Sequence, residues 1–231
     1  MIHASRTYSD YSTPATIRLL DGLLESTSNP QKYRTTMHDI GIELGKCLSE
    51  SISNSSCLVV STAEDADFLS KGIIESISSN ASKLYTGVFW NNHYQVSDGS
   101  SVAPVVHKYL QPGFQESKNL IVAKSVLSGS CVVRTNILAL IDELDKDTSI
   151  FIVSPVLYKE AEQSLRGEFP EEISSRFKFV YFAKDADRNE ASGEVTPGIG
   201  GMIYQLLGLS EQPVRTGYMP QLVKDALSTP T

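Results

Sequence analysis

Apolar residues recur along this chain in short continuous runs that alternate with longer segments at helical spacing. The continuous runs, which are typical of buried strands, lie at 57–61, 83–90, 120–123, 149–153 and 179–183. The segments at helical spacing lie at 30–51, 63–77, 130–145 and 157–168, and a further one begins at Thr13. Strands that alternate with helices predict an α/β fold, in which helices cover both faces of a mostly parallel sheet.

The N-terminal region and one internal segment depart from this alternation. Thr13-Pro14 is a good helix start, with Thr as N-cap and Pro in the first turn, and it begins a predicted N-terminal helical arm. The polar stretch 1–12 before it is expected to be flexible. Residues 91–112 are polar and irregular and carry the turn signal Asp98-Gly99, which favours a protruding β-arm or lid.

The composition narrows the class of protein. A chain of 231 residues suits one large α/β domain or two small ones. Its net charge of −7 argues against a nucleic acid or an anionic membrane as the main partner, although a local basic pocket is compatible with it. No segment approaches the ~20 apolar residues of a membrane span, and the polar N-terminus lacks the apolar region of a secretory signal. A cytoplasmic location is therefore expected, with an organellar leader as the open alternative.

The cysteines and histidines do not suggest a metal site. Cys47, Cys57 and Cys131 are isolated, form no Cys-x-x-Cys pair, and suit a reducing compartment. The histidines are scattered, and only His93 and His107 flank the expected lid, where they are candidate ligand contacts. A nucleophile elbow and a complete P-loop are also missing from the sequence. The sequence therefore predicts no metal ligand set and no catalytic residue.

The segment 119–133 has the order of a phosphate-binding strand, loop and helix. A short apolar run leads to the small residues Ser128, Gly129 and Ser130, and the following helix begins near Cys131. Free backbone N–H groups at such a helix N-terminus attract an anion, and the helix dipole adds to the attraction. These residues are therefore the candidate phosphate site. The alternative is an ordinary turn between strand and helix, in which a serine serves as N-cap.

A second glycine-rich turn follows later in the chain. The run from Phe182 to Gly201 contains Asp-Arg-Asn-Glu and then Val-Thr-Pro-Gly-Ile-Gly-Gly. Together with the loop at 128–131 and the helices from Thr13, it resembles, in the same order and through Leu209, the motifs of the uracil phosphoribosyltransferases. The resemblance implies a single phosphoribosyltransferase-like domain over 13–209. The polar tail 210–231 follows it, and its pattern predicts one short helix near Met219 to Leu227. It also implies a base-binding backbone at Val195, Pro197, Gly198, Ile199, Gly200 and Gly201.

Charged positions of the family's motifs are replaced in this chain. The acidic pair that precedes the family's phosphate loop falls on Ala123 and Lys124. Its arginines fall on Thr62 and Trp90, and the acid after its base-binding turn falls on Gly201. Lys108 is the one basic residue that the resemblance carries over, and a solvated lysine is the alternative. The degenerate region for ribose and diphosphate thus comprises Thr62, Ala63, Glu64, Trp90, Lys108, Ala123 and Lys124.

Some of these replacements also have a purely structural interpretation. Glu64, Asp65 and Asp67 would repel a phosphate, but acids at a helix N-terminus stabilise the helix, and this interpretation accounts for them fully. Trp90 can stack on a ring, yet packing is the more common role of a tryptophan at a strand end.

Three hypotheses for function follow. The first is a uracil phosphoribosyltransferase-like protein with impaired catalysis, which acts as a binding, regulatory or partner subunit in nucleotide metabolism. The second is an active phosphoribosyltransferase of pyrimidine salvage with altered contacts, which would use Mg²⁺. The third is an enzyme of the same fold that uses another phosphorylated sugar or nucleotide. The missing acids favour the first, because the transition state of transfer develops positive charge on the ribose.

The first hypothesis requires no cofactor and no metal. Its expected ligand is a nucleotide or a phosphorylated sugar, and neither nucleic acid nor membrane is an expected partner. The resemblance implies a homodimer or a hetero-oligomer with a homologue, with the N-terminal helices and the lid arm in the interface. Independently, the apolar segment from Met202 to Leu207 needs a surface that covers it.

Overall fold

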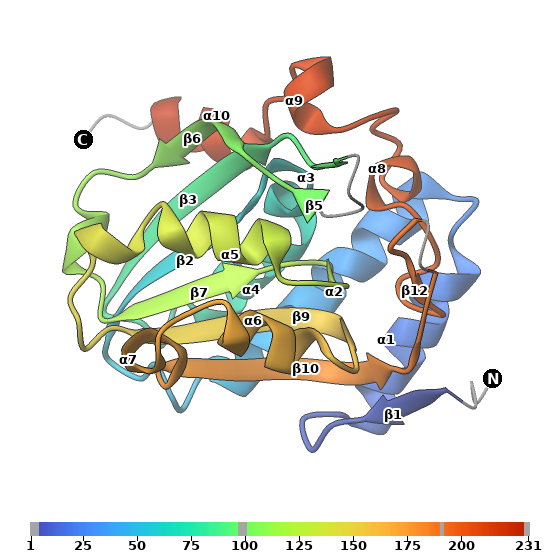
Figure 1. The fold of residues 1–231 in the computed structure, drawn as a ribbon, viewed down its shortest axis with the longest axis horizontal. Helices are drawn as coiled ribbons and strands as arrows, with labels where there is room; N and C mark the ends of the chain where they lie inside the picture. Colours follow the sequence, from blue (N-terminus) through green and yellow to red (C-terminus); the bar gives the residue numbers. More distant parts are fainter. Residues whose placement is uncertain (1–4, 97–100, 190–191, 229–231) are drawn as a thin grey trace.

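A central, mostly parallel sheet organises the protein, whose computed structural model describes residues 5–96, 101–189 and 192–228. The strands of this sheet are β1 (Arg6–Tyr8), β2 (Ser56–Thr62), β3 (Lys83–Asn91), β6 (Val105–Leu110), β7 (Asn119–Ala123), β8 (Val126–Leu127), β9 (Ser149–Tyr158) and β10 (Phe177–Asp185). Their order is β1-β10-β9-β7-β2-β3-β6, with β8 paired to β9 (Figure 1). The inner strands are parallel, and β1 and β6 pair antiparallel at the two edges. The predicted sheet is confirmed.

Helices cover both faces of this sheet (Figure 1). On one face lie α1 (Pro14–Glu25), α2 (Pro30–Leu48) and α4 (Lys71–Ile77), and on the other lie α5 (Cys131–Leu138) and α6 (Ala161–Gly167). Alternate residues of β7 serve the two cores, since Ile121 packs on the α2 face and Val122 on the α5 face. The other helical segments are α3 (Ala63–Asp65), η1 (Ala66–Ser70), η2 (Phe114–Glu116), η3 (Ile141–Glu143), α7 (Glu171–Ser174), α8 (Ile203–Leu206), α9 (Pro213–Thr216) and α10 (Gln221–Ser228).

Several predicted elements have other extents in the structure. Strand β9 continues past the predicted end at Val153, because it gains β8 as a neighbour on one side and keeps β10 on the other. The predicted helix 63–77 is divided into α3, the π-helical η1 and α4, and the predicted helix 130–145 ends at Leu138. The expected lid at 91–112 consists of a short hairpin of β4 (Tyr94–Gln95) and β5 (Ser101–Val102), followed by edge strand β6. Its predicted turn at Asp98-Gly99 lies outside the described residues.

The N-terminal segment, expected to be flexible up to residue 12, contains strand β1. Arg6 in this strand is buried, and its Nε and Nη2 donate to the two carboxylate oxygens of Asp185 at 2.7 Å each. Such a bidentate arginine–carboxylate contact fixes the angle as well as the distance between its partners. It therefore holds β1 against the edge of the sheet beside β10.

The C-terminal segment is packed on the body by the residues around Trp90. Asp67 in η1 accepts hydrogen bonds from the backbone N–H groups of Gln221 and Leu222 at 2.9 Å each, and it therefore caps α10. The indole Nε1 of Trp90 donates to the carbonyl of Tyr218 at 2.8 Å. The predicted packing role of Trp90 is thus confirmed, and the short helix expected in this segment is present as α10.

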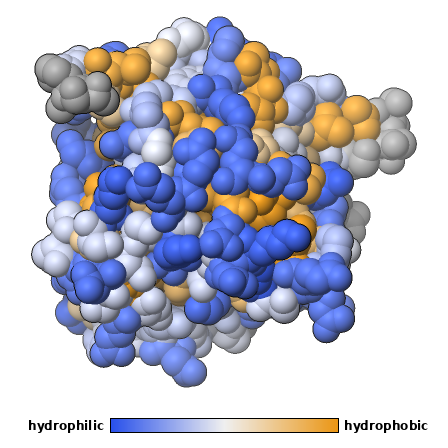
Figure 2. Space-filling model, turned by 90° about the vertical axis from the view of Figure 1, so that its left-hand side faces the viewer, coloured by the Kyte–Doolittle hydropathy of each residue, from blue (hydrophilic) through white to orange (hydrophobic). Residues whose placement is uncertain are grey.

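The apolar segment after the second glycine-rich turn is covered by the protein's own chain. Ile203, Leu206 and Leu207 belong to the same core as the buried side chains of α1 and α2. The N-terminal helices therefore supply the surface that covers these three side chains, whereas Met202 at the start of the segment is 44% exposed. Figure 2 shows that the left-hand side of the molecule in Figure 1 is largely hydrophilic with apolar areas between. Within the described residues, no helix is both long and apolar enough to span a membrane.

Glycines let helix α2 approach η1 and α4 closely. A Cβ on Gly72 would lie 2.2 Å from the carbonyl oxygen of His38, and a Cβ on Gly41 would lie 2.3 Å from that of Leu69. These neighbours are backbone atoms, which cannot rotate away as a side chain can. Any larger residue at either position must therefore separate the helices.

We expect Gly72→Ala to lower the free energy of unfolding by about 2 kcal/mol, as overpacking substitutions do. Gly22→Ala is the matched control, because no atom lies within 4 Å of its Cβ position and alanine is favoured in a helix interior by about 0.5–1 kcal/mol. Urea denaturation of both variants measures the difference. Equal stability of the two variants would contradict the close crossing.

Candidate functional site

A cavity of about 640 Å³ opens at the carboxyl ends of the parallel strands, where open α/β sheets bind ligands. Its walls come from the segment 124–134, the turn 192–204 and the hairpin of β4 and β5. The cavity therefore brings together the predicted phosphate loop, part of the region that the resemblance assigns to ribose and diphosphate, and part of the predicted base-binding turn. The predicted site residues that line it are Glu64, Lys124, Ser128, Gly129, Ser130, Cys131, Val195, Ile199 and Gly201.

The predicted phosphate loop presents open backbone N–H groups. Within the described chain, no protein group accepts a hydrogen bond from the amides of Ser128, Gly129 or Ser130. Ser130 is the N-cap residue of α5, but its side chain makes no hydrogen bond to the helix and instead donates to Oε1 of Glu168 at 2.8 Å. The alternative of a serine-capped turn is therefore not what the structure contains. The open amides lie where a helix N-terminus favours an anion.

Arg188, which lies in β11 (Asp187–Arg188), faces this loop. Its Nη2 lies 3.8 Å from the position that a Cβ on Gly129 would take. The guanidinium stacks on the ring of Tyr158, with 5.7 Å between its central carbon and the ring centroid. Among the described residues, no carboxylate lies within ion-pairing distance of it. Arg188 thus adds a positive charge beside the open amides.

Lys124 is bonded to carboxylates that follow the neighbouring strand. Its Nζ donates to Oδ2 of Asp65 at 2.6 Å and to Oε1 of Glu64 at 3.2 Å. The Lys124 side chain is 12% exposed, and those of Glu64 and Asp65 are 8% and 1% exposed. Burial by itself would lower the pKa of Lys124, but the attraction of Asp65 and then of Glu64 outweighs burial and raises that pKa. The lysine is therefore held in its charged form.

These contacts correct the interpretation of the acids as helix-terminal charges alone. Glu64 and Asp65 do lie in the first turn of α3, but both are buried and both pair with Lys124. The partners are 60 and 59 residues apart in sequence, and the parallel pairing of β2 with β7 brings them together. Burial raises the pKa of Tyr204 in the cavity wall, and the negative charge of Glu64 adds to that rise.

The remaining residues of the degenerate region do not line the cavity. Thr62 is buried and donates its hydroxyl hydrogen to Oδ2 of Asp65 at 2.9 Å, and Ala63 and Ala123 are core residues. Trp90 lies under the C-terminal segment. Lys108 lies on β6 with its Nζ 3.8 Å from Oε1 of Glu143, which agrees with the alternative of a solvated lysine.

The predicted base-binding turn is only partly exposed to the cavity. Val195 in β12 (Val195–Thr196), Ile199 and Gly201 line the cavity, whereas Gly198 between them is bonded to other parts of the chain. The N–H of Gly198 donates to Asp185 at 2.8 Å, and its carbonyl accepts from Arg6 at 2.7 Å. Gly200 has a φ of 92°, and a Cβ there would lie 2.5 Å from the methyl carbon of Thr27. Pro197, Gly198 and Gly200 therefore shape the turn without lining the cavity.

The prediction from sequence missed several residues that line the cavity. Arg134, Glu168, Arg188 and Tyr204 all contribute side chains to its wall. Arg134 lies one helical turn after Ser130, so helical spacing alone places it beside the loop. Glu168 and Tyr204 carry no comparable signal, because each comes from another element.

The histidines of the expected lid have different positions. His93 lines the cavity, whereas His107 lies on the outer strand β6. Burial lowers the pKa of His93, and the positive charge of Lys124 lowers it further. The His93 ring is therefore neutral at pH 7. In the described part of the chain, no group of three or more His, Cys, Asp and Glu side chains is arranged to hold a metal ion.

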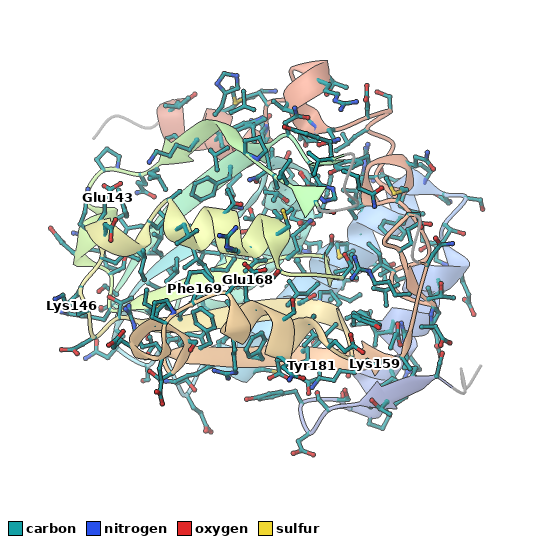
Figure 3. All side chains as sticks on the ribbon, viewed as in Figure 1. Glu143, Lys146, Lys159, Glu168, Phe169 and Tyr181 are labelled. Atoms are coloured by element: carbon teal, nitrogen blue, oxygen red, sulfur yellow. The ribbon has the colours of Figure 1, made fainter. Side chains whose placement is uncertain are left out.

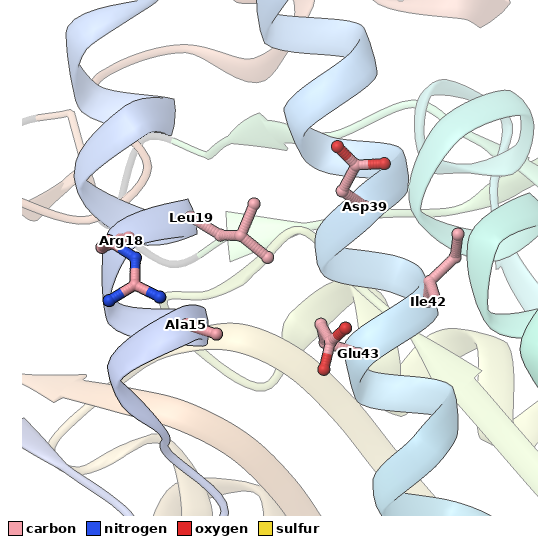
Figure 4. A pocket seen from close by; sticks show the side chains of 6 residues that line it. All are labelled: Ala15, Arg18, Leu19, Asp39, Ile42 and Glu43. Atoms are coloured by element: carbon pink, nitrogen blue, oxygen red, sulfur yellow. The ribbon is translucent and has the colours of Figure 1, made fainter.

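A second hollow lies between helices α1 and α2 and contains none of the predicted site residues. Figure 4 shows Leu19 and Glu43 directed toward the space between the two helices, and Arg18 of α1 also lines the hollow.

Comparisons with known proteins support the fold. No protein-family model matches the sequence, and no curated protein matches it either. The solved structure of the AQ2163 protein from Aquifex aeolicus is similar to this one with a TM-score of 0.66 at 13% identity, over 84% of this chain and 95% of that one. The APRTase from Giardia lamblia has a TM-score of 0.42 at 9% identity, over 71% of this chain and 84% of that one. A hypoxanthine phosphoribosyltransferase from Staphylococcus aureus has a TM-score of 0.41 at 15% identity, over 54% and 65%. At these identities, the similarity to AQ2163 shows the fold alone.

Removal of Lys124 should unbalance the buried carboxylates. We expect Lys124→Met to lower the free energy of unfolding by about 3 kcal/mol or more, because the loss of one partner leaves buried charge without compensation. Lys118→Met is the matched control, since Lys118 pairs with Asp145 at the surface with side chains 62% and 45% exposed, and it should cost under about 1 kcal/mol.

The pH dependence of this difference follows from the raised pKa of Lys124. A raised lysine pKa contributes stability that is complete below the ordinary value of 10.5 and is lost only as the pH rises above it. The wild-type protein should therefore keep the contribution of Lys124 between about pH 6 and pH 9. Urea denaturation of the wild type, Lys124→Met and Lys118→Met across this pH range measures the contribution. If the two variants lose equal free energy of unfolding, the buried contact is contradicted.

Proposed function

We propose that the cavity binds a nucleoside 5′-monophosphate, and that the protein is a phosphoribosyltransferase-like binding or partner subunit with little transfer activity. The observation that carries the proposal is the position of Arg188 opposite the open amides of Ser128, Gly129 and Ser130. Backbone N–H groups at a helix N-terminus and an arginine guanidinium are both good ligands for a phosphate group. Assembly as a homodimer, or with a homologue, is part of the proposal and rests on the resemblance.

The rest of the cavity suits the nucleoside part of such a ligand. Val195, Ile199 and Ile203 give its wall an apolar character, and Tyr204 adds an aromatic ring. The volume of about 640 Å³ lies within the range of roughly 300–1,000 Å³ that is common for small-molecule sites. The resemblance assigns a uracil ring to this part of the cavity, which supports uridine monophosphate as the first ligand to test.

The buried lysine cluster supports impaired transfer. Lys124, Glu64 and Asp65 occupy the region that the resemblance assigns to ribose and diphosphate. Two carboxylates against one ammonium group leave a net negative charge, which disfavours a diphosphate. Both carboxylates are already bonded to Lys124, so neither is free to stabilise the positive charge that develops on the ribose during transfer.

An active phosphoribosyltransferase with altered contacts is the second candidate function. It is favoured by Glu64, whose carboxylate lines the cavity although the family's acidic positions carry Ala123 and Lys124. In this case Glu64 would leave Lys124 and face the ribose, and Mg²⁺ would bind through the oxygens of the substrate and water. Turnover separates this candidate from the first.

Closing the phosphate loop should remove nucleotide binding. We expect Gly129→Leu to abolish binding of uridine monophosphate without loss of stability, because Gly129 points into the cavity toward Arg188 and its backbone is not left-handed. Arg188→Gln should weaken binding about tenfold or more, as the loss of a charged hydrogen bond does. Arg18→Gln removes an exposed arginine that does not line this cavity and is the control. Isothermal titration calorimetry measures all affinities, and a Gly129→Leu protein that binds like the wild type would exclude the site.

Transfer activity should be low. With uracil, phosphoribosyl diphosphate and Mg²⁺, we expect formation of uridine monophosphate far below the usual enzyme range, whose lower end is about one turnover per second. Product quantification by chromatography gives the rate. A rate in the usual range would replace the first candidate function with the second, whereas absence of nucleotide binding would remove both.

A further inference from the structure

Glu168 places a carboxylate of the protein beside the proposed phosphate loop. Its Oε1 accepts a hydrogen bond from the Ser130 hydroxyl at 2.8 Å, and its Oε2 lies 2.9 Å from Nε of Arg134. All three residues line the cavity. Figure 3 shows Glu168 between helices α5 and α6. Donors in the first turn of α5 are thus occupied by a negative charge that the protein itself supplies.

Neither of these contacts is required by the packing of the fold. The side chains of Arg134 and Glu168 are 44% and 37% exposed, and an ion pair between such exposed groups contributes little to stability. Ser130 is buried at the start of α5, where a serine ordinarily bonds to the helix amides, yet its hydroxyl is turned to Glu168. The arrangement leaves the amides open and places a carboxylate next to them.

A carboxylate and a phosphate group compete for the same donors. Both accept hydrogen bonds from serine hydroxyls, and both form short contacts with arginine. A phosphate at the amides of Gly129 would approach Ser130 and Arg134, which Glu168 now holds, and would meet the negative charge of Glu168. Because the Glu168 side chain is 37% exposed, it has room to turn toward solvent when the donors change partners.

We propose that Glu168 is a specificity-determining residue, which competes with the phosphate group of the ligand and so sets how strongly the cavity prefers phosphorylated over unphosphorylated nucleosides. The inference rests on the proposed function. Every ligand with a phosphate at the loop must displace Glu168 from Ser130 and Arg134. A nucleoside without phosphate leaves these contacts of Glu168 in place, so its affinity does not depend on them. Glu168 thus weakens phosphate binding and leaves the nucleoside contacts unchanged.

The test compares uridine monophosphate with uridine in calorimetric titrations of the wild type, Glu168→Gln and Glu172→Gln. Glu168→Gln removes the charge and keeps the shape, and Glu172 is an exposed glutamate on α7 outside the cavity. We expect Glu168→Gln to bind uridine monophosphate about tenfold tighter than the wild type, with the affinity for uridine unchanged. Glu172→Gln should match the wild type for both ligands. The combined variant Ser130→Ala with Glu168→Gln should lose part of the gain, because one of the released donors is gone.

The outcomes separate this inference from the proposed function. If the wild type binds uridine monophosphate and Glu168→Gln binds it no tighter, the inference fails and the proposed function stands. An equal gain for uridine and its monophosphate would also overturn the inference, since the effect would not depend on phosphate. If neither the wild type nor Glu168→Gln binds the nucleotide, both fail.

Discussion

The buried contact of Lys124 with Glu64 and Asp65 determines the chemistry available at the centre of this molecule. It joins the ends of the adjacent strands β2 and β7 at the edge where ligands of such sheets bind. A nearly enclosed ammonium group requires counter-charge, and the carboxylate of Asp65, 1% exposed, requires the lysine in turn. Replacement of either the lysine or the carboxylate alone would leave a buried charge without a partner. The charges of Lys124, Glu64 and Asp65 therefore mainly compensate one another inside the protein, and only their net charge is available to act on a ligand.

The short segment after β2 connects this contact to the C-terminal part of the chain. Glu64 and Asp65 turn inward to Lys124, while Asp67 turns outward and caps α10. Asp67 lies in the π-helical segment η1, two positions after Asp65. Two positions along a helix turn a side chain by about 200°, so these acids point in different directions although they are close in sequence. The three acids Glu64, Asp65 and Asp67 thus connect the sheet, through Lys124, to the C-terminal helix α10.

Features that depend on residues close together in the sequence could be predicted, and contacts between residues far apart in the sequence could not. The strands around Val59, Ile121 and Val180 were readable because their apolar runs are local, and Thr13 caps α1 as predicted because a cap depends on the next three residues. The pairing of Lys124 with Glu64 depends on strand order, which no local pattern contains. For the same reason the acids looked like isolated helix-terminal charges, and Glu168 was not visible as a neighbour of the phosphate loop.

The two ends of the cavity differ in what their chemistry depends on. At the phosphate loop the donors are backbone amides, which any small residues at 128–130 would supply, and the flanking Arg188 only adds to them. At the end that the resemblance assigns to ribose, transfer would depend on side-chain carboxylates that are free and correctly placed, and Lys124 engages both Glu64 and Asp65 there. On the proposed function, replacement of a few side chains would therefore remove transfer and leave the backbone donors of the loop in place. This asymmetry, set by backbone donors at one end and a buried charge pair at the other, is the physical reason to expect binding without efficient catalysis.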